Sequence, residues 1–338
     1  MVGAGSIGRR HVRCLKNCGR AVLGICEIND TLRHEVAAQY GVAEVFANLP
    51  DALERPWTAA VVATPAHTHI PIALELAKQN IHLLIEKPLA TQPAGVDDLV
   101  RLVEQRELCA GVAYVWRAHP GLAAMRAMLQ SGRLGRALEI VVTSGQSFPF
   151  YRPTYRQTYY ADHNQGGGAI QDALTHMLNL GEWLVGPIDC VTADATHLAL
   201  EGVDVEDTVH VLARHGAIPG NYALNQHQYP NETTITVVCS NGTLKFELHE
   251  NRWRWMDQPT GAWHDEPWNP MRRDDWFIVQ EQAFLDVLEG KATLLCTLGE
   301  GIQTFRATLA VLQSVRLPRR WIGVTSSCRS DVGKRCGK

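Results

Sequence analysis

Near its start the chain carries Gly3-Ala4-Gly5-Ser6-Ile7-Gly8, a run that opens an amphipathic segment. Its glycines permit a tight turn, the close approach of a pyrophosphate and close helix packing. Glu27 follows Gly8 by 19 residues, at the end of the apolar run Ala21–Cys26. An acid there can accept both ribose hydroxyls of NAD and would repel the 2′-phosphate of NADP. The pattern predicts NAD, with NADP disfavoured, bound by Gly3, Gly5, Ser6, Ile7, Gly8 and Glu27.

Only Met1 and Val2 precede this turn. A dinucleotide-binding turn normally follows a strand of about five or more residues. We therefore expect the central strand to be nearly absent from this chain. Either the native start lies upstream of Met1, or the chain is a defective gene product.

Short apolar runs alternate with amphipathic segments over the first 116 residues. Continuous apolar strands between helices are typical of a parallel sheet covered on both faces. Residues 1–116 are therefore predicted to form a Rossmann domain, a doubly wound α/β unit. The apolar runs are Ala21–Cys26, Ala59–Ala63, Ile81–Ile85 and Cys109–Val115, and the segments with helical spacing include Thr31–Tyr40, Ile70–Gln79 and Gly95–Gln105.

After residue 117 the pattern changes to longer alternating strands, such as Ala137–Thr143, Thr208–Ala213 and Thr233–Ser240. Asn241-Gly242 lies between Thr233–Ser240 and Thr243–Leu248, which is a strong hairpin signal. Residues 117–324 are predicted to form an α+β domain with a mainly antiparallel, open-faced sheet. The helices Gln280–Leu288 and Gly299–Val315 are expected to cover one face, and a second subunit the other, giving a homodimer or homotetramer. Residues 325–338 read as a flexible tail.

The composition is that of an ordinary globular enzyme of about two domains. The 338 residues include 32 basic and 35 acidic side chains, so the net charge of −3 provides no electrostatic case for nucleic acid or an anionic membrane. No apolar run is long enough to span a bilayer. Nine cysteines, an odd number without a repeated CxxC pair or a secretory leader, indicate a cytoplasmic protein without a metal site.

Two further motifs follow apolar runs. Glu86-Lys87-Pro88 ends the run Ile81–Ile85, at the edge where open α/β sheets bind ligands. Lys87 is placed to meet a substrate, although a solvated surface lysine is the plainer alternative. Thr64-Pro65 suits a turn beside a nicotinamide. We assign Thr64, Pro65 and Glu86 to the cofactor side of the site.

The most informative later stretch runs from Gly166-Gly167-Gly168 to Asn179. At helical spacing, Asp172, His176 and Asn179 share one polar stripe. A carboxylate one turn before an imidazole can raise its basicity and orient it, as a base that removes a hydroxyl proton requires. The alternative is an ordinary solvated helix face. The substrate-binding candidates are Tyr151, Arg152, Tyr155, Arg156 and Asn179.

Taken together, GAGSIG at 3–8, ATP at 63–65, EKP at 86–88 and GGGxxxDxxxH at 166–176 resemble the Gfo/Idh/MocA family, the glucose-fructose oxidoreductase and inositol dehydrogenase relatives. The resemblance spans residues 1–324. It implies that Lys87, Asp172 and His176 form the catalytic group. Leu174 and Asn179 stand where the family often has glycine and aspartate, which leaves the substrate subgroup open.

The resulting hypothesis is an NAD-dependent oxidoreductase that moves a hydride between nicotinamide and a secondary alcohol or ketone of a sugar, cyclitol or related polyol. His176 would act as the base with Asp172 supporting it, and Lys87 would hold the reacting oxygen. Lys87 and His176 could exchange these roles. An NAD-assisted glycoside hydrolase and a non-catalytic nucleotide-sensing protein remain alternatives.

Overall fold

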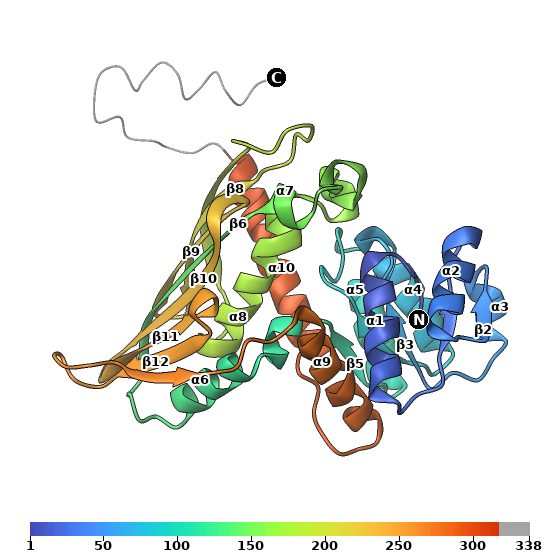
Figure 1. Cartoon of the computed structure of the whole chain (residues 1–338), viewed down its shortest axis with the longest axis horizontal. Helices are drawn as coiled ribbons and strands as arrows, with labels where there is room; N and C mark the ends of the chain where they lie inside the picture. Colours follow the sequence, from blue (N-terminus) through green and yellow to red (C-terminus); the bar gives the residue numbers. More distant parts are fainter. Residues whose placement is uncertain (318–338) are drawn as a thin grey trace.

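The computed structural model describes residues 1–317 and contains two sheets with their helices (Figure 1). The predicted tail, residues 325–338, lies outside the described residues, as do Cys328 and Cys336.

The first sheet is parallel, as predicted, and has helices between its strands. Strand β1 pairs with β2, and β3, β4 and β5 pair in that order. The strands are β1 (Gly24–Cys26), β2 (Glu44–Phe46), β3 (Ala59–Val62), β4 (His82–Ile85) and β5 (Ala110–Val112). The helices are α1 (Ser6–Cys18), α2 (Asp30–Tyr40), α3 (Leu49–Leu53), η1 (Ala66–Thr68), α4 (His69–Lys78), α5 (Val96–Gln105) and η2 (Val115–Ala118).

The expected central strand is reduced to a bridge at Val2. Val2 bridges Cys26 of β1 on one side and Val62 of β3 on the other, both in parallel. Its backbone N–H donates to Val61 O at 2.9 Å, and its carbonyl accepts from Ala63 N at 2.8 Å. Val2 therefore occupies the position between β1 and β3 that the first strand of a doubly wound sheet takes, and it leads directly into the Gly3–Gly8 turn.

The second sheet has eight strands in the order β13-β12-β11-β10-β6-β9-β8-β7. Its neighbours are antiparallel except for the parallel pair β6 and β9. Cys239 pairs with Gly242 across Asn241-Gly242, which confirms the predicted hairpin. The strands are β6 (Ala137–Ser147), β7 (Cys190–Thr196), β8 (Thr208–His215), β9 (Ile218–Asn225), β10 (His227–Cys239), β11 (Gly242–Glu247), β12 (Arg252–Met256) and β13 (His264–Pro267).

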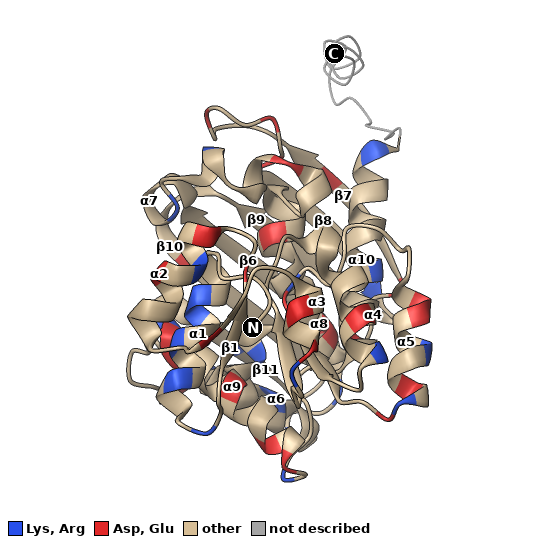
Figure 2. Ribbon diagram, turned by 90° about the vertical axis from the view of Figure 1, so that its right-hand side faces the viewer, with Lys and Arg blue, Asp and Glu red and all other residues tan. Residues whose placement is uncertain are grey.

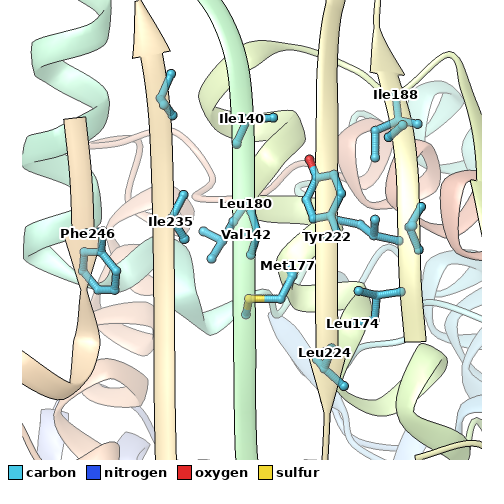
Figure 3. Packing of buried hydrophobic residues seen from close by; sticks show 14 of the residues in the cluster. Ile140, Val142, Leu174, Met177, Leu180, Ile188, Tyr222, Leu224, Ile235 and Phe246 are labelled. Carbon is cyan, nitrogen blue, oxygen red and sulfur yellow. The ribbon is translucent and has the colours of Figure 1, made fainter. Parts of the chain in front are cut away.

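Helices cover one face of the second sheet, and in the described part of the chain its other face carries none (Figure 1). Leu174 of the π-helix η6, with Met177 and Leu180 of α8, packs against the sheet. Their contacts include Val142 and Tyr222 (Figure 3). The helices of this part are α6 (Pro120–Gln130), α7 (Phe148–Tyr151), η3 (Tyr155–Gln157), η4 (Tyr159–Ala161), η5 (His163–Gln165), η6 (Ile170–Leu174, a π-helix), α8 (Thr175–Val185), η7 (Leu248–Glu250), α9 (Arg273–Leu288) and α10 (Leu298–Arg316).

The expected role of Gln280–Leu288 as a cover for the second sheet is wrong. This segment belongs to α9, which packs along α1 of the first sheet (Figure 1). The two helices are joined by polar contacts as well as packing: Arg13 pairs with Asp274 at 2.6 Å, and Glu281 bonds His11. These partners lie more than 260 residues apart, so helical periodicity alone could not show which sheet α9 joins. Helix α10 does pack on β7, as predicted for Gly299–Val315.

The surface carries both signs of charge, intermixed over the helices and loops (Figure 2). No helix in residues 1–317 is long and apolar enough to cross a membrane.

Candidate active site

The Gly3–Gly8 turn ends at the N-terminus of α1, and its packing explains the glycines. A Cβ on Gly8 would lie 2.9 Å from the carbonyl carbon of Gly3 and closer still to its oxygen. Gly3 has a φ of +87° and packs on the backbone of Ala63. By contrast, no described atom lies within 4 Å of a Cβ placed on Gly5. The space beside Gly5 is therefore free for a ligand.

The start of α1 offers backbone donors to an anion. In the described chain no side chain caps this helix, whose first residues are Ser6 and Ile7. The unpaired N–H groups at a helix N-terminus and the helix dipole favour a phosphate there. This turn therefore fits the pyrophosphate of a dinucleotide, and the binding roles of Gly3, Gly5, Ser6, Ile7 and Gly8 stay predictions.

Glu27 lies at the end of β1, beside the same turn. One carboxylate oxygen accepts from Ala4 N at 2.7 Å and the other from Asn29 N at 2.9 Å. These two bonds hold the carboxylate next to the glycine turn, where a ribose attached to the pyrophosphate would reach it.

Thr64 and Pro65 follow β3 at its carboxyl end, as predicted. The Thr64 hydroxyl accepts from Thr68 Oγ1 at 2.7 Å, and the Thr64 carbonyl bonds the ring of His69 at 2.8 Å. A Cβ on Gly3 would come within 2.9 Å of the Thr64 side chain. Thr64 and Pro65 therefore form a turn packed against the glycine turn.

Glu86 does not present its carboxylate to the cofactor side, contrary to the prediction. The side chain is buried, and its Oε1 contacts His11 Nε2 of α1 at 2.8 Å. Its Oε2 accepts from the backbone N–H of Lys87 at 3.0 Å. Both carboxylate oxygens of Glu86 are therefore bonded to protein groups. One of these bonds holds the backbone at Lys87.

His11 sits between two buried carboxylates. Its Nε2 contacts Glu86, and its Nδ1 contacts Glu281 of α9. Burial alone would lower the pKa of His11, but Glu281 and Glu86 together raise it to about 10. His11 lowers the pKa of Glu86 in return, against the opposing effect of burial. His11, Glu86 and Glu281 form a charged trio. The trio connects α1, the end of β4 and α9 next to Lys87.

Lys87 and Asp172 meet, although they lie 85 residues apart. Lys87 Nζ donates to the Asp172 carbonyl at 2.7 Å and to Asp172 Oδ1 at 3.1 Å. Tyr159 also donates its hydroxyl to Asp172 Oδ1, at 2.7 Å. Burial opposes ionisation of Asp172, but Lys87 and Tyr159 lower its pKa to about 2. Asp172 is therefore a carboxylate that orients the Lys87 ammonium.

His176 lies one helical turn after Asp172. Burial, and then the positive charges of Lys87 and Arg273, hold the pKa of His176 well below its usual range. Its Nδ1 is buried and has no hydrogen-bond partner within residues 1–317. The charge of Asp172 acts to raise the pKa of His176, as predicted, but it is outweighed by burial and Lys87. Among the described residues, Asp172 Oδ1 bonds Lys87 and Tyr159, not the imidazole. The imidazole is therefore neutral near pH 7, and its lowered pKa makes it a weaker base than an exposed histidine.

The glycine run 166–168 and its neighbours hold the Asp172 turn in place. A Cβ on Gly167 would come within 2.5 Å of Tyr159 O, so this position accepts only glycine. Glu206 accepts from Ile170 N at 2.8 Å and contacts His163 Nε2 at 2.5 Å. The segment then forms a π-helix before α8, and Asp172 lies within it.

The structure separates the five predicted substrate residues. Arg152 lies near Asp172 and lowers its pKa, and Tyr151 is 48% exposed beside it in sequence. Tyr155 and Asn179 are corrections, whereas Arg156 is exposed and its role stays a prediction. Tyr155 is buried and donates to Glu201 O at 2.6 Å, and Arg156 donates to the same carbonyl.

Asn179 is the second correction. It is 1% exposed, accepts from Arg117 at 2.8 Å and donates to Thr304 at 2.9 Å. Its amide therefore joins α8 to α10 in the protein interior. Helical periodicity predicted that Asn179 shares a polar stripe with His176. In the structure, the Asn179 amide instead hydrogen-bonds Arg117 and Thr304 in the interior.

Sequence reasoning missed two groups near Asp172. Tyr159 bonds Asp172 directly, and Arg273, the first residue of α9, acts on it through its charge. Tyr159 falls in the aromatic and polar segment before the glycine run, which is a weak signal. Nothing local marks Arg273, since α9 comes close only through its packing on α1.

No group of three or more His, Cys, Asp or Glu side chains arranged for a metal ion occurs within residues 1–317. Two small cavities in the described chain have linings that include neither Lys87 nor His176. One is lined by apolar residues such as Val112 and Phe284, and the other lies beneath Val2 and Trp57.

This geometry defines a class of protein, an oxidoreductase with a dinucleotide turn and a lysine–carboxylate–histidine group at the adjacent sheet edge. Two family models match the chain: "Oxidoreductase family, NAD-binding Rossmann fold" over residues 1–114 and "GFO/IDH/MocA C-terminal domain" over residues 122–245. The chain belongs to the Gfo/Idh/MocA oxidoreductase family, and its first part is an NAD-binding Rossmann fold.

Known relatives agree with this placement. The chain is 27% identical over 259 residues to a levoglucosan dehydrogenase of Pseudarthrobacter phenanthrenivorans, a match that spans 66% of this chain and 64% of that protein, less than two thirds of its length. A structure of levoglucosan dehydrogenase with NADH and levoglucosan superposes with a TM-score of 0.83 at 20% identity, covering 93% of this chain and 95% of that one.

A second structure, the WlbA dehydrogenase from Bordetella pertussis in complex with NADH and UDP-GlcNAcA, has a TM-score of 0.80 at 24% identity. The superposition covers 94% of this chain and 97% of the other. These structural likenesses concern the fold.

Proposed function

We propose that this protein is an NAD-dependent oxidoreductase that moves a hydride between the nicotinamide and a secondary alcohol or ketone of a sugar, cyclitol or related polyol. The observation that carries the proposal is the meeting of Lys87 and Asp172, from distant segments, beside the neutral His176. NAD supplies the hydride chemistry when bound. The protein must bind the substrate oxygen and manage its proton.

The roles of the three side chains follow from their contacts. His176 makes no hydrogen bond with the described residues and is neutral, so it can take the proton of a substrate hydroxyl. Lys87 spends two donor contacts on Asp172, which leaves a third N–H for the substrate oxygen. Its positive charge stabilises the negative charge that develops there. Asp172 positions Lys87.

We assign cofactor binding to residues 1–116, and substrate binding and oligomer formation to residues 117–324. Preference for NAD over NADP rests on Glu27, whose carboxylate lies beside the turn that fits the pyrophosphate. The proposed cytoplasmic location rests on the cysteine pattern alone.

A homodimer or homotetramer would form through the helix-free face of the second sheet. Leu212 on β8 is 60% exposed, and Val141 and Val238 also point to the side away from the core. Apolar groups on a broad sheet face favour association. Light scattering at micromolar concentration should show a dimer or tetramer that Leu212→Glu shifts toward smaller species, and a monomeric wild type would exclude this interface.

The function is tested by NADH absorbance in a screen of polyols, sugars and sugar derivatives with NAD. Steady NADH formation with a free alcohol supports the dehydrogenase. Cleavage of a glycoside without net NADH release would favour the hydrolase, and tight NADH binding without turnover on any compound would favour a sensor.

A further inference from the structure

Tyr159 contacts Asp172, the carboxylate that positions Lys87. Its hydroxyl donates to Asp172 Oδ1 at 2.7 Å, and the same oxygen accepts from Lys87 Nζ at 3.1 Å. The phenol oxygen and the ammonium therefore both lie within hydrogen-bond distance of one atom. A substrate oxygen that Lys87 holds is then close to the Tyr159 hydroxyl as well.

The protonation states fix the direction of this hydrogen bond. Against the effect of burial, Lys87 and Tyr159 lower the pKa of Asp172 to about 2, so its carboxylate only accepts. Burial, and then the charge of Asp172, raises the pKa of Tyr159, so the phenol keeps its proton near pH 7. The single phenol hydrogen is used on Asp172. Toward any other group the Tyr159 oxygen is therefore an acceptor.

The Tyr159 side chain is accessible from solvent. The residue is 43% exposed, and its bond to Asp172 is exposed, whereas the bonds between Lys87 and Asp172 are partly buried. No donor among residues 1–317 bonds the phenol oxygen. This acceptor is therefore free for a ligand on the open side of the Lys87–Asp172 pair.

The neighbouring tyrosines have a different, structural role. Tyr155 and Tyr160 are 2% and 1% exposed, and their hydroxyls bond Glu201 O and Gln226 inside the protein. They fill the core of this segment and satisfy their polar groups there. Of these three tyrosines, Tyr159 is the accessible one, and its hydroxyl bonds a residue of the site.

The glycine run holds the backbone of Tyr159 close to that of Lys87. A Cβ on Gly167 would come within 2.5 Å of Tyr159 O, and a Cβ on Gly166 would lie 3.2 Å from Pro88 Cγ, next to Lys87. One glycine thus packs on the Tyr159 segment and its neighbour packs on the Lys87-Pro88 segment. This packing sets the spacing of Tyr159 and Lys87 before a ligand binds, as a preorganised site requires.

We propose that Tyr159 is a specificity-determining residue, whose oxygen accepts a hydrogen bond from a second substrate hydroxyl on the carbon next to the one that reacts. In a vicinal diol, one oxygen accepts from Lys87 while the other donates to Tyr159. Both contacts are within reach because the two protein atoms share one neighbour, Asp172 Oδ1. The inference rests on the proposed function and narrows its substrates to compounds with a free hydroxyl beside the reacting carbon.

A purely structural role of Tyr159, as a cover for Asp172, is the other explanation. Tyr159→Phe would then slow all substrates alike, because the bond to Asp172 is lost whichever compound is bound. A substrate contact has a different signature. Loss of the Tyr159 hydroxyl and loss of the substrate hydroxyl remove the same interaction, so their effects are not additive.

The test measures kcat/KM for a parent compound and its monodeoxy derivatives with the purified full chain and NAD. D-glucose and myo-inositol are the parent compounds, and if the polyol screen finds a different substrate, that substrate and its monodeoxy derivatives replace them. In the wild type, removal of the hydroxyl next to the reacting carbon should lower kcat/KM by about 3- to 12-fold, the range of one neutral hydrogen bond.

In Tyr159→Phe, we expect this preference for the parent compound to shrink to within about twofold, which is less than one hydrogen bond contributes. The kcat of this variant should fall alike for parent and derivative, since Asp172 loses a donor. Tyr229→Phe is the matched control, because Tyr229 of β10 is 83% exposed, and it should keep the preference of the wild type.

Equal preferences in the wild type and Tyr159→Phe would overturn the inference and leave the oxidoreductase assignment standing. A wild type that turns over every monodeoxy derivative as well as the parent compound would do the same, and this measurement needs no variant. Absence of turnover on every compound would count against the proposed function. Calorimetry of the NADH-loaded chain with myo-inositol and a monodeoxy-inositol then decides the contact: binding that loses its hydroxyl preference in Tyr159→Phe supports it, and no binding overturns it.

Discussion

Gly5 and Gly8 should respond differently to substitution by alanine: Gly8→Ala should lower stability, and Gly5→Ala should lower NADH affinity. In Gly8→Ala the new Cβ lies 2.9 Å from Gly3 C and closer to Gly3 O. Favourable contacts begin near 3.5 Å, so α1 or the turn must shift by more than about 0.6 Å. The neighbour is backbone and cannot rotate away. Overpacking of this kind costs about 1–3 kcal/mol, and we expect the upper end of that range.

Each kcal/mol lost from the free energy of unfolding lowers the melting temperature by roughly 2–4 °C. With a loss of about 3 kcal/mol, Gly8→Ala should therefore melt about 6–12 °C below the wild type. Gly5→Ala should melt within about 2 °C of it, because no described atom lies near the added Cβ and φ at this position is −60°. Its NADH affinity should nevertheless fall at least about tenfold, since the methyl group occupies the space that the pyrophosphate needs.

Differential scanning calorimetry and NADH fluorescence titration on the same preparations measure the two effects. A Gly8→Ala variant that melts like the wild type would show that the turn is looser than its geometry indicates. A Gly5→Ala variant that binds NADH like the wild type would remove the pyrophosphate from this turn.

The remaining predictions concern the charged groups. His176→Ala and Lys87→Ala should lower turnover by about 100- to 10,000-fold while NADH affinity changes little, and a near-normal rate in steady-state assays would remove that residue from the mechanism. Because the pKa of His11 is raised to about 10, its stabilising effect is complete below its unfolded value near 6.5 and is lost as pH rises through 10. Melting temperature should therefore fall between pH 7 and 10, more steeply than in His11→Asn, and equal slopes would contradict the charged trio. Glu27→Ser should reduce the preference for NAD over NADP at least about tenfold in binding titrations, and an unchanged ratio would exclude Glu27 as its determinant.

Much of the fold could be read from local signals. The glycine turn depends on φ values and close approaches among neighbouring residues, and the Asn241-Gly242 hairpin depends on a two-residue turn, so both are visible in short stretches of sequence. The parallel sheet follows from continuous apolar runs between helical segments. Lys87, Asp172 and His176 could be selected as candidates because each lies in a short motif, at a strand end or after a glycine run.

The partners of those residues were decided by the tertiary structure. Asp172 bonds Lys87 and Tyr159, because the end of β4 and the Asp172 turn meet across 85 residues of sequence. Glu86 contacts His11, which also bonds Glu281 because α9 packs on α1 across 270 residues. Arg273 begins the same helix, and its charge acts on Asp172 although 101 residues separate them in sequence. Periodicity shows which face of a segment is polar. Which polar groups meet on that face depends on the packing of segments distant in the chain, for which the sequence carries no local signal.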